Sequence, residues 1–493
     1  MTVIIKSRTL AATLWCFAAL GLNAQEEIDF TPPGQIVPVA DEGPEDIVNV
    51  DNDVDDYSVP EPTDDDLLAQ EFGLYVQLMR DSVFDEADTV AKRVVELAMQ
   101  QKGPQSDEAA KALTNLAIVQ HQTGQFDAAT QNFQSSIEII EEIEDRLHAQ
   151  LVNPLKGLGA SQLENGRADL AIGTFQRAVH VTHVNEGPHN LDQVELLESL
   201  AETNLRIGDF DSAKAAQDVI YALNIREYEL DTLELVPSLM RRAAWQHRAG
   251  FVYDERTTYR RVIRIIESES ESGKKDLQLV EPLIMLGKSH FFVDTSGSEA
   301  VGGMHLSSGE IYFRRAAKIA FEQPEQDWQV IAQASLALGD FYMYENNLQR
   351  ARQVYGGTWD LLSEDESRHD VRREQLQSSV TVIEQRLPQY VNSEESEEED
   401  NTLLQGKIAV TYNISQRGRV ANLKMVEADP AEFTNMQRYV QREMRRRVFR
   451  PLFEDGEPVE TAEKMLVHNF FYRQADLDAL RAAADAASTD EKE

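Results

Sequence analysis

The chain has 493 residues, which is long enough for several domains or for one extended repeat array. Its 86 acidic residues outnumber its 47 basic residues, and the formal net charge at pH 7 is −39. Nucleic acids and anionic membrane surfaces attract basic patches, so this charge argues against both as main partners. The hydrophobic fraction of 42% is ordinary, and most of the chain is therefore expected to be globular.

Residues 1–24 have the layout of a secretory signal peptide. Lys6 and Arg8 precede an apolar run from Leu10 to Leu22, and the segment ends at the small residue Ala24. The run is shorter than the roughly 20 residues that span a bilayer. We therefore expect cleavage, with an uncleaved membrane anchor as the alternative. Cys16 is the single cysteine, so the mature chain is expected to fold without disulfides.

Residues 25–67 form an acidic leader. Fifteen acidic residues lie between Gln25 and Asp66, and no Lys or Arg occurs there. Self-repulsion and the scarcity of apolar residues predict that this segment is disordered. It is interpreted as a solubilising leader, or as a tether or lure for basic partners.

A pattern with a period of 42 residues follows the leader. The residues expected at the turn between two paired helices are Ser82, Gly124, Gly166, Gly208 and Gly250. Five residues after the first four turns there is a small residue, namely Ala87, Ala129, Ala171 and Ala213. A period in this range predicts stacked helical hairpins, with glycine ending the first helix and alanine where two helices cross closely.

The stretches 112–137 and 154–179 carry this pattern well, and they resemble the tetratricopeptide repeat. The resemblance implies an α-solenoid of about seven hairpins over residues 68–390, with helices longer than in the usual repeat of about 34 residues. One unit is degenerate, because Arg242 and Glu255 replace the expected Leu and Ala. Gly287 and Gly339 occupy the same repeat position 52 residues apart, which predicts an inserted loop at 294–309. A closing helix is expected to run to about Pro388.

Residues 391–403 form an acidic linker, with six acidic residues between Ser393 and Asp400. Residues 404–473 then read as a small α+β module, followed by a tail at 474–493. Alternating Ile408, Val410, Tyr412 and Ile414 predict a strand. A second strand follows the turn at 416–418, and its mixed faces suggest a bulge.

A helix is expected next, with Asp429 as its N-cap and Pro430 at its first position. Its predicted apolar stripe consists of Phe433, Met436, Val440 and Met444. A last strand is expected at 462–472, so the order is strand, strand, helix, strand.

This order resembles the C-terminal domain of the TonB family. The matching features are Gly406, Gly418–Val420, Arg445–Arg447, Phe449–Pro451 and Gly456–Val459, although Arg447 stands where family members usually carry Trp. The resemblance implies that an extended segment of an outer-membrane receptor adds a strand to the sheet edge. The edge strand is Ala462–Tyr472, and the candidate side chains for partner-strand binding are Lys464, Leu466, His468, Phe470 and Tyr472. A plainer interpretation is that Lys464 and His468 protect an exposed edge from aggregation.

Six arginines in and after the expected helix are candidates for contact with an acidic partner. Four of them are Arg438, Arg442, Arg445 and Arg446, and the other two are Arg447 and Arg450. A solvated helix face is the alternative. The leader and the 393–400 segment are acidic candidates within the chain itself.

Motifs of enzymatic chemistry are missing from the sequence. The LGKS stretch at 286–289 lacks the first glycine of a phosphate-binding loop, because Pro282 stands there. His180, His183 and His189 could reach one metal ion, but no clear carboxylate or cysteine ligand joins them. We therefore predict no catalytic, cofactor-binding or metal-binding residue.

Together these observations predict a periplasmic adaptor of a Gram-negative envelope that binds peptides or proteins in its solenoid and a partner strand in its TonB-like module, assisting TonB-dependent transport. The alternative is a membrane-anchored energy transducer of the TonB type that works with an ExbB–ExbD complex. An enzyme that uses the loop at 294–309 is a third hypothesis, without a residue constellation to support it.

Overall fold

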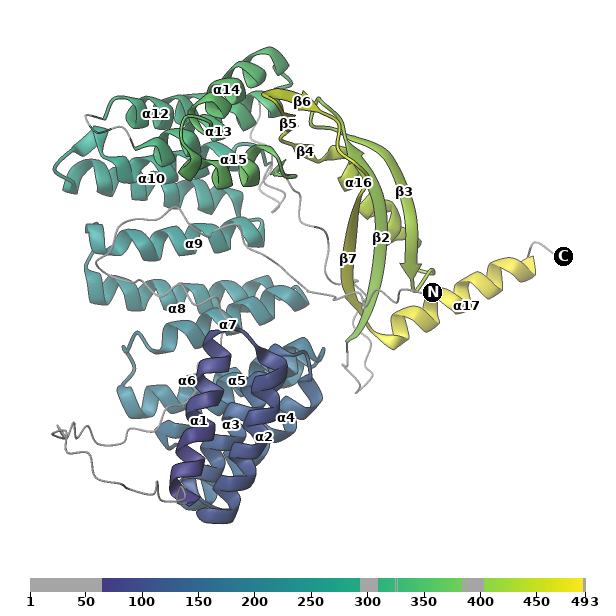
Figure 1. Ribbon diagram of the computed structural model, residues 1–493. Coiled ribbons are helices and arrows are strands. Elements are labelled where there is room, and N and C mark those ends of the chain that lie inside the picture. Colours follow the sequence, from purple (N-terminus) through teal and green to yellow (C-terminus); the bar gives the residue numbers. More distant parts are fainter. Residues whose placement is uncertain are drawn as a thin grey trace, which may run out of the picture.

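The computed structural model describes residues 64–292, 309–323, 325, 327–383, 387 and 403–490. The predicted signal peptide and most of the acidic leader, inserted loop and acidic linker lie outside these residues. In the described part, a helical solenoid leads into a small α+β module (Figure 1). This arrangement confirms a mainly helical solenoid followed by a region that contains strands.

Paired antiparallel helices build the solenoid. The described helices form seven hairpins and one short closing helix: α1 (Asp64–Arg80), α2 (Phe84–Gln101), α3 (Asp107–Gln122), α4 (Phe126–Ile143), α5 (Val152–Glu164), α6 (Ala168–Glu186), α7 (Gln193–Ile207), α8 (Phe210–Tyr228), α9 (Val236–Ala249), α10 (Val252–Glu269), α11 (Val280–Ser289), α12 (Glu310–Phe321), α13 (Trp328–Tyr344), α14 (Leu348–Leu361) and α15 (His369–Leu376). Short 3₁₀ turns precede several of them: Ala149–Leu151, Leu233–Leu235, Gly273–Lys275, Leu277–Leu279 and Glu366–Arg368.

The turns inside the hairpins lie where the period places them. Ser82 has a φ of 57°, and Gly124, Gly166, Gly208 and Gly250 have φ values between 76° and 85°. Positive φ ends the first helix of each pair, and glycine adopts it without steric cost. The four alanines of the pattern are fully buried, as expected at close helix crossings: Ala87, Ala129, Ala171 and Ala213.

Two other glycines of the repeat have a packing role inside helices. A Cβ on Gly287 in α11 would lie 2.7 Å from the Phe313 ring, and one on Gly339 in α13 would lie 2.5 Å from the Tyr355 ring. Both positions therefore let an aromatic ring of the partner helix approach the backbone. Gly287 belongs to a helix, not to a phosphate-binding loop.

In the degenerate unit, neighbouring side chains compensate both unusual residues. Arg242 donates hydrogen bonds to Gln217 O (2.9 Å) and to Asp218 Oδ1 (2.7 Å). Glu255 is almost fully buried, with His247 Nδ1 at 3.2 Å from its carboxylate. These partners explain how the fold accepts two charged residues at normally apolar positions.

The module contains the strands β2 (Leu404–Ile414), β3 (Val420–Asp429) and β7 (Lys464–Tyr472), in the spatial order β3-β2-β7. The helix α16 (Thr434–Arg446) covers one face of this sheet, and its predicted apolar stripe is buried. Shorter strands connect α16 to β7: β4 (Val448–Phe449), β5 (Leu452–Glu454) and β6 (Glu457–Val459). The helix α17 (Gln474–Asp490) follows β7 and extends away from the sheet (Figure 1).

Two predicted helix boundaries are wrong. The helix α16 begins at Thr434, not near Pro430, because β3 continues through Asp429, which pairs with Lys407. Asp429 is therefore the end of a strand and not an N-cap. The closing helix ends at Leu376, and residues 381–383 form the strand β1 (Thr381–Ile383), which pairs with β4 of the module.

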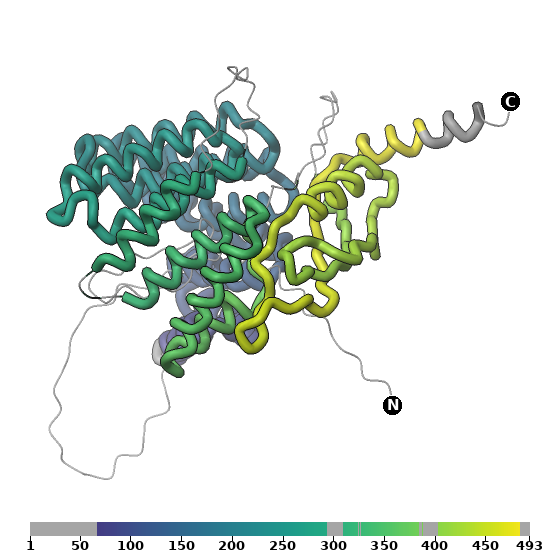
Figure 2. The backbone as a smooth tube through the Cα atoms, turned by 90° about the horizontal axis from the view of Figure 1, so that it is seen from above, coloured from purple at the N-terminus to yellow at the C-terminus, as the bar shows by residue number. Residues whose placement is uncertain are grey.

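The pairing of β1 with β4 joins the solenoid to the module. Ile383, Val448 and Phe453 belong to the same hydrophobic cluster as the last solenoid helices. The tube drawing shows the module beside the late hairpins (Figure 2). Its main sheet therefore stands in a defined position relative to the solenoid.

Candidate functional site

The strand β7 is one edge of the three-stranded sheet. It pairs with β2 over nine consecutive residues without a bulge, from Leu404 opposite Tyr472 to Tyr412 opposite Lys464. Within the described residues, β2 is the only strand that pairs with β7. A regular outer edge of this length presents a row of backbone donors and acceptors of the kind that can pair with another chain.

The opposite edge, β3, is much less regular. Its pairing with β2 shifts register between Ala409 and Val410 and again between Thr411 and Asn413. The exposed side chains of Lys424 and Glu427 add charge along this strand. Bulges and charged side chains are devices that protect a sheet edge from pairing. The better template for an added strand is therefore β7.

Most of the predicted partner-binding side chains lie on the inner face of the sheet. Phe470 and Tyr472 are buried against Phe433 from the helix side, and His468 is also buried. Leu466 is half-buried against the same core, and Lys464 is half-buried. The strand thus uses these side chains for its own core, and an added strand would rely on the backbone edge.

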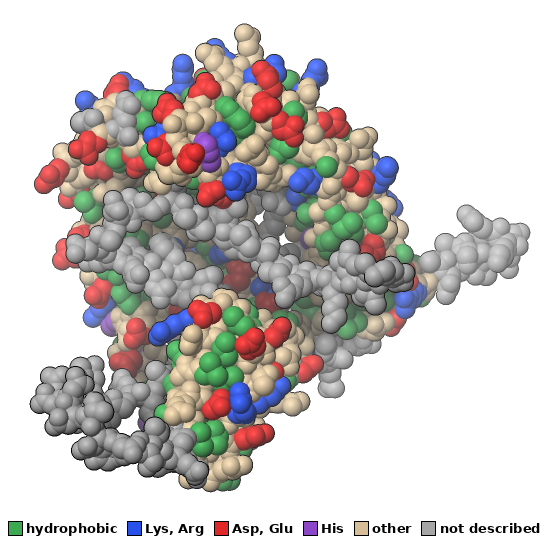
Figure 3. Space-filling view, viewed as in Figure 1, with side chains coloured by type: hydrophobic (Ala, Val, Ile, Leu, Met, Phe, Trp, Pro, Cys, Tyr) green, Lys and Arg blue, Asp and Glu red, His purple; other side chains and the backbone are tan. Residues whose placement is uncertain are grey.

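The exposed hydrophobic side chains of β7 are not among the predicted partner-binding residues. Met465 is 61% exposed and Val467 is 44% exposed, and Val426 of β3 is exposed as well. Hydrophobic side chains gather over the sheet in the space-filling view (Figure 3). The pairing with β2 shows which face each β7 side chain occupies, because Ile408, which is buried, lies opposite His468.

Two of the four candidate arginines on α16 have partners within that helix. Arg442 Nε and Arg446 Nη1 lie 3.2 Å and 3.4 Å from Glu443 Oε1, and the Glu443 side chain is only 2% exposed. Arg438 and Arg445 are exposed. The structure therefore divides these four arginines into one pair around a buried carboxylate and one pair on the surface.

A cavity of about 160 Å³ lies where the module meets the solenoid. It is lined by Phe291, Tyr344, Ile383, Arg419, Glu443, Arg446, Arg447 and Val448. Arg447, at the position where the family usually has Trp, is therefore part of a polar cavity wall. Its described lining combines three arginines and one carboxylate with apolar side chains.

The module is fixed to the solenoid by a buried ion pair. Arg450 Nε and Nη2 donate to Asp340 Oδ1 and Oδ2 at 3.0 and 2.9 Å, and the Tyr355 hydroxyl donates to Asp340 Oδ1 at 2.7 Å. Burial disfavours the charge on Arg450, but Asp340 outweighs it and raises the pKa of Arg450. Burial, together with Asp340, raises the pKa of the Tyr355 hydroxyl. Sequence reasoning missed this pair because the partners are 110 residues apart.

A second contact lies at the other end of the sheet. Leu403, just before β2, donates its backbone N–H to the carbonyl of Gly166 at 3.1 Å. Gly166 is the turn between α5 and α6, whereas Asp340 and Tyr355 belong to α13 and α14. The module therefore reaches from the seventh hairpin back to the third.

The first helices of consecutive hairpins carry a series of ion pairs. Lys156 of α5 pairs with Glu195 of α7, and Arg206 Nη1 of α7 lies 2.7 Å from Glu164 Oε1 of α5. Glu198 and Glu202 of α7 continue the series toward Arg241 and Arg248 of α9. Burial raises the pKa of Glu198, against the opposing effect of Arg241. These pairs join neighbouring units and leave alternating charges along the first helices.

Residues 76–142 match the family model described as tetratricopeptide repeat. This match includes the first two hairpin turns of the 42-residue pattern, at Ser82 and Gly124. This part of the solenoid is built of tetratricopeptide repeats. It is therefore a scaffold of the type that binds other proteins.

A comparison with solved structures matches chains that contain tetratricopeptide-like repeats. A Podosopora anserina chain described as a kinesin light chain with TPR-like repeats is 14% identical, covering 42% of this chain and 98% of its own, with a TM-score of 0.38. The C-terminal part of a TPR repeat-containing protein from Cytophaga hutchinsonii is 10% identical, covering 61% of this chain and 98% of its own, with a TM-score of 0.37. A comparison with curated proteins gave no significant match.

Among the described residues, no cluster of side chains is suited to a metal. No group of three or more His, Cys, Asp or Glu side chains in those residues is placed to hold an ion, so His180, His183 and His189 do not form one there. Among the same residues, no helix combines the length and the apolar character needed to cross a membrane.

Proposed function

We propose that this tetratricopeptide-repeat protein is an adaptor whose C-terminal module binds an extended segment of a partner protein as a fourth strand beside β7. The observation that carries this proposal is the regular pairing of β7 over nine residues, combined with its position at the edge of the sheet. Backbone hydrogen bonds would supply most of the affinity, as in other cases of strand addition.

The resemblance of the module to the TonB C-terminal domain supports this proposal. The order of two strands, a helix and a last edge strand matches the order expected from the motifs. Two motif glycines have structural roles, because any side chain at Gly406 would collide with the Phe470 ring, and one at Gly418 with the Phe449 carbonyl. We infer that the partner strand belongs to an envelope protein, in particular a TonB-dependent outer-membrane receptor.

We further propose that the protein acts in the periplasm after cleavage of residues 1–24. The alternative is a chain that remains anchored through this segment and works with an ExbB–ExbD complex. The mass of the N-terminal peptide of the purified protein distinguishes the two, because an N-terminus near Gln25 leaves no anchor.

The binding proposal can be tested with a photo-crosslinking amino acid in Gram-negative cells that express the full chain. We place it at Val467 on β7 and, as the matched control, at Val426 on β3, since both valines are exposed on the module. We expect Val467 to capture a segment of an outer-membrane receptor and Val426 to capture none. Equal capture at both positions, or none at Val467, would overturn the proposal.

A further inference from the structure

The module contacts the solenoid at two distant places and spans the region between them. One contact is the Arg450–Asp340 pair with the adjoining core, and the other is the hydrogen bond between Leu403 and Gly166. Because the repeats stack in sequence order, the turns at Gly208 and Gly250 lie between these two contacts.

The outer edge of β7, which pairs with no further described strand, faces the solenoid (Figure 1). Of the three strands in the main sheet, β7 lies nearest to the solenoid and β3 lies farthest from it (Figures 1 and 2). Each end of β7 points to one of the two contacts. Tyr472 pairs with Leu404, next to the Leu403–Gly166 contact, and Lys464 pairs with Tyr412, toward the Arg450–Asp340 contact. A strand added to β7 would therefore run between the sheet and the solenoid.

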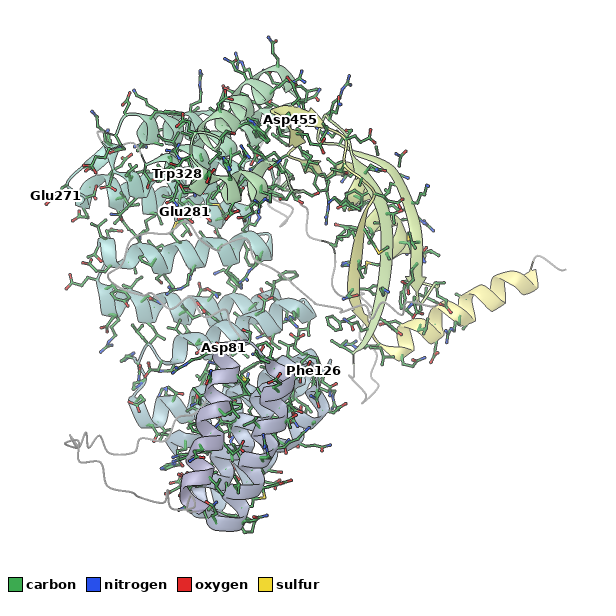
Figure 4. All side chains as sticks on the ribbon, viewed as in Figure 1. Asp81, Phe126, Glu271, Glu281, Trp328 and Asp455 are labelled. Atoms are coloured by element: carbon green, nitrogen blue, oxygen red, sulfur yellow. The ribbon has the colours of Figure 1, made fainter. Side chains whose placement is uncertain are left out.

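The solenoid turns lie on the side that faces the sheet. Phe126, just after the Gly124 turn, lies on this side, whereas Glu271, near a loop between hairpins, lies on the opposite side (Figure 4). The turns at Gly208 and Gly250 are the equivalents of the Gly124 turn in the 42-residue pattern. By this equivalence, the residues that follow them, beginning with Phe210 and Phe251, belong to the same side of the solenoid as Phe126.

Phe210 and Phe251 give this surface an aromatic character. Phe210 is 46% exposed, and its ring meets the Phe251 ring edge to face at 6.3 Å. Trp245 packs behind Phe251. Exposed Asp209 and Asp211 flank Phe210 in the sequence. An apolar side chain with a basic neighbour matches an aromatic surface flanked by carboxylates.

We propose that the binding site is composite: a partner segment pairs with β7 along one side and packs against the Phe210–Phe251 surface along the other. This inference rests on the proposed function and adds the partner's chemistry, which is an extended segment with an apolar residue next to a basic one. Binding between two surfaces of one chain raises affinity beyond that of an isolated sheet edge.

Peptides of about 12 residues suit the test, since β7 pairs over nine. A random library of such peptides is selected on the full chain, and each selected peptide is crosslinked from Val467 and, separately, from Phe210. Phe321, which is 51% exposed at the end of α12, serves as the control position. We expect the same peptide to crosslink at Val467 and at Phe210 but not at Phe321.

Affinity measurements complete the test. Phe210→Ala is expected to weaken binding by roughly fivefold or more, as for an aromatic residue at the centre of an interface, while Phe321→Ala leaves it unchanged. Crosslinking at Val467 alone, with Phe210→Ala without effect, would overturn the composite site and keep strand addition at β7. Crosslinking at Phe210 alone, or at neither position, would overturn both proposals.

Discussion

Arg450 of the module and Asp340 of α13 form a doubly hydrogen-bonded ion pair in which each side chain is only 5% exposed. The Tyr355 hydroxyl completes the hydrogen bonding of the carboxylate. This pair lies beside the shared core of the solenoid and module. It therefore determines how the β7 edge is positioned.

Arg450→Ala is expected to destabilise the protein by about 3–5 kcal/mol, because it leaves Asp340 buried without its cation. The triple variant Arg450→Met, Asp340→Leu and Tyr355→Phe should recover most of this loss, because it removes both charges and also the Tyr355 hydroxyl, which would otherwise lose its acceptor. The control is Arg352→Met, which breaks the exposed pair with Glu457 and should cost less than about 1 kcal/mol. Urea unfolding of the three variants checks the prediction. Equal losses of unfolding free energy for Arg450→Ala and Arg352→Met would contradict the stabilising role of the buried Arg450–Asp340 pair.

Gly287→Ala is expected to destabilise the sixth hairpin. The new methyl group would lie 2.7 Å from the Phe313 ring, which is fully buried and has little room to move. Overpacking of this kind costs about 1–3 kcal/mol. Gly173→Ala in α6 meets nothing within 4 Å and should instead stabilise its helix by about 0.5–1 kcal/mol. Thermal unfolding that moved in the same direction for both variants would refute this packing role.

Gly166→Ala is expected to weaken the contact between Gly166 and Leu403, just before β2. Gly166 and Gly208 both have positive φ, so alanine strains the two turns in a similar way. Only at Gly166 would the methyl group also collide with the backbone carbonyl of Leu403. Hydrogen exchange near residues 403–406 should therefore accelerate in Gly166→Ala and not in Gly208→Ala. Identical exchange in the two variants would mean that the Leu403 contact does not hold the module.

His121 makes the stability of the early repeats depend on pH. Burial lowers the pKa of His121, with Glu164 acting in the opposite direction. The unfolded chain therefore binds a proton more readily than the folded chain, and folding stability falls as the pH drops below about 6.5. We expect His121→Gln to lose less stability than the wild type between about pH 7.5 and pH 5.5. Unfolding curves with the same pH dependence in both proteins would contradict this assignment.

The sequence contained enough information for the repeats because their signal is local and recurs in phase. The turn glycines and the buried alanines follow from the 42-residue period alone. The apolar stripe of α16 and the alternation in β2 were readable for the same reason, since 3.6-residue and two-residue periods are properties of single elements.

The contacts between the solenoid and the module could not be predicted from such local patterns. Asp340 and Arg450 are far apart in the chain, and neither carries a local pattern that marks it as buried. The strand β1 has three residues, too few for a periodic signal. The predicted partner-binding side chains of β7 lie on the inner face of the sheet for a related reason. Which alternate residues of an edge strand face the core is known only when its pairing with β2 is known.

The most direct measurement of strand addition is amide hydrogen exchange in the full chain, with and without a peptide that crosslinks at Val467. If the peptide pairs with β7, exchange should slow in residues 464–472 and stay unchanged in residues 420–429, the other edge of the same sheet. Unchanged exchange along β7 while the peptide is bound, or slowing confined to β3, would contradict the account.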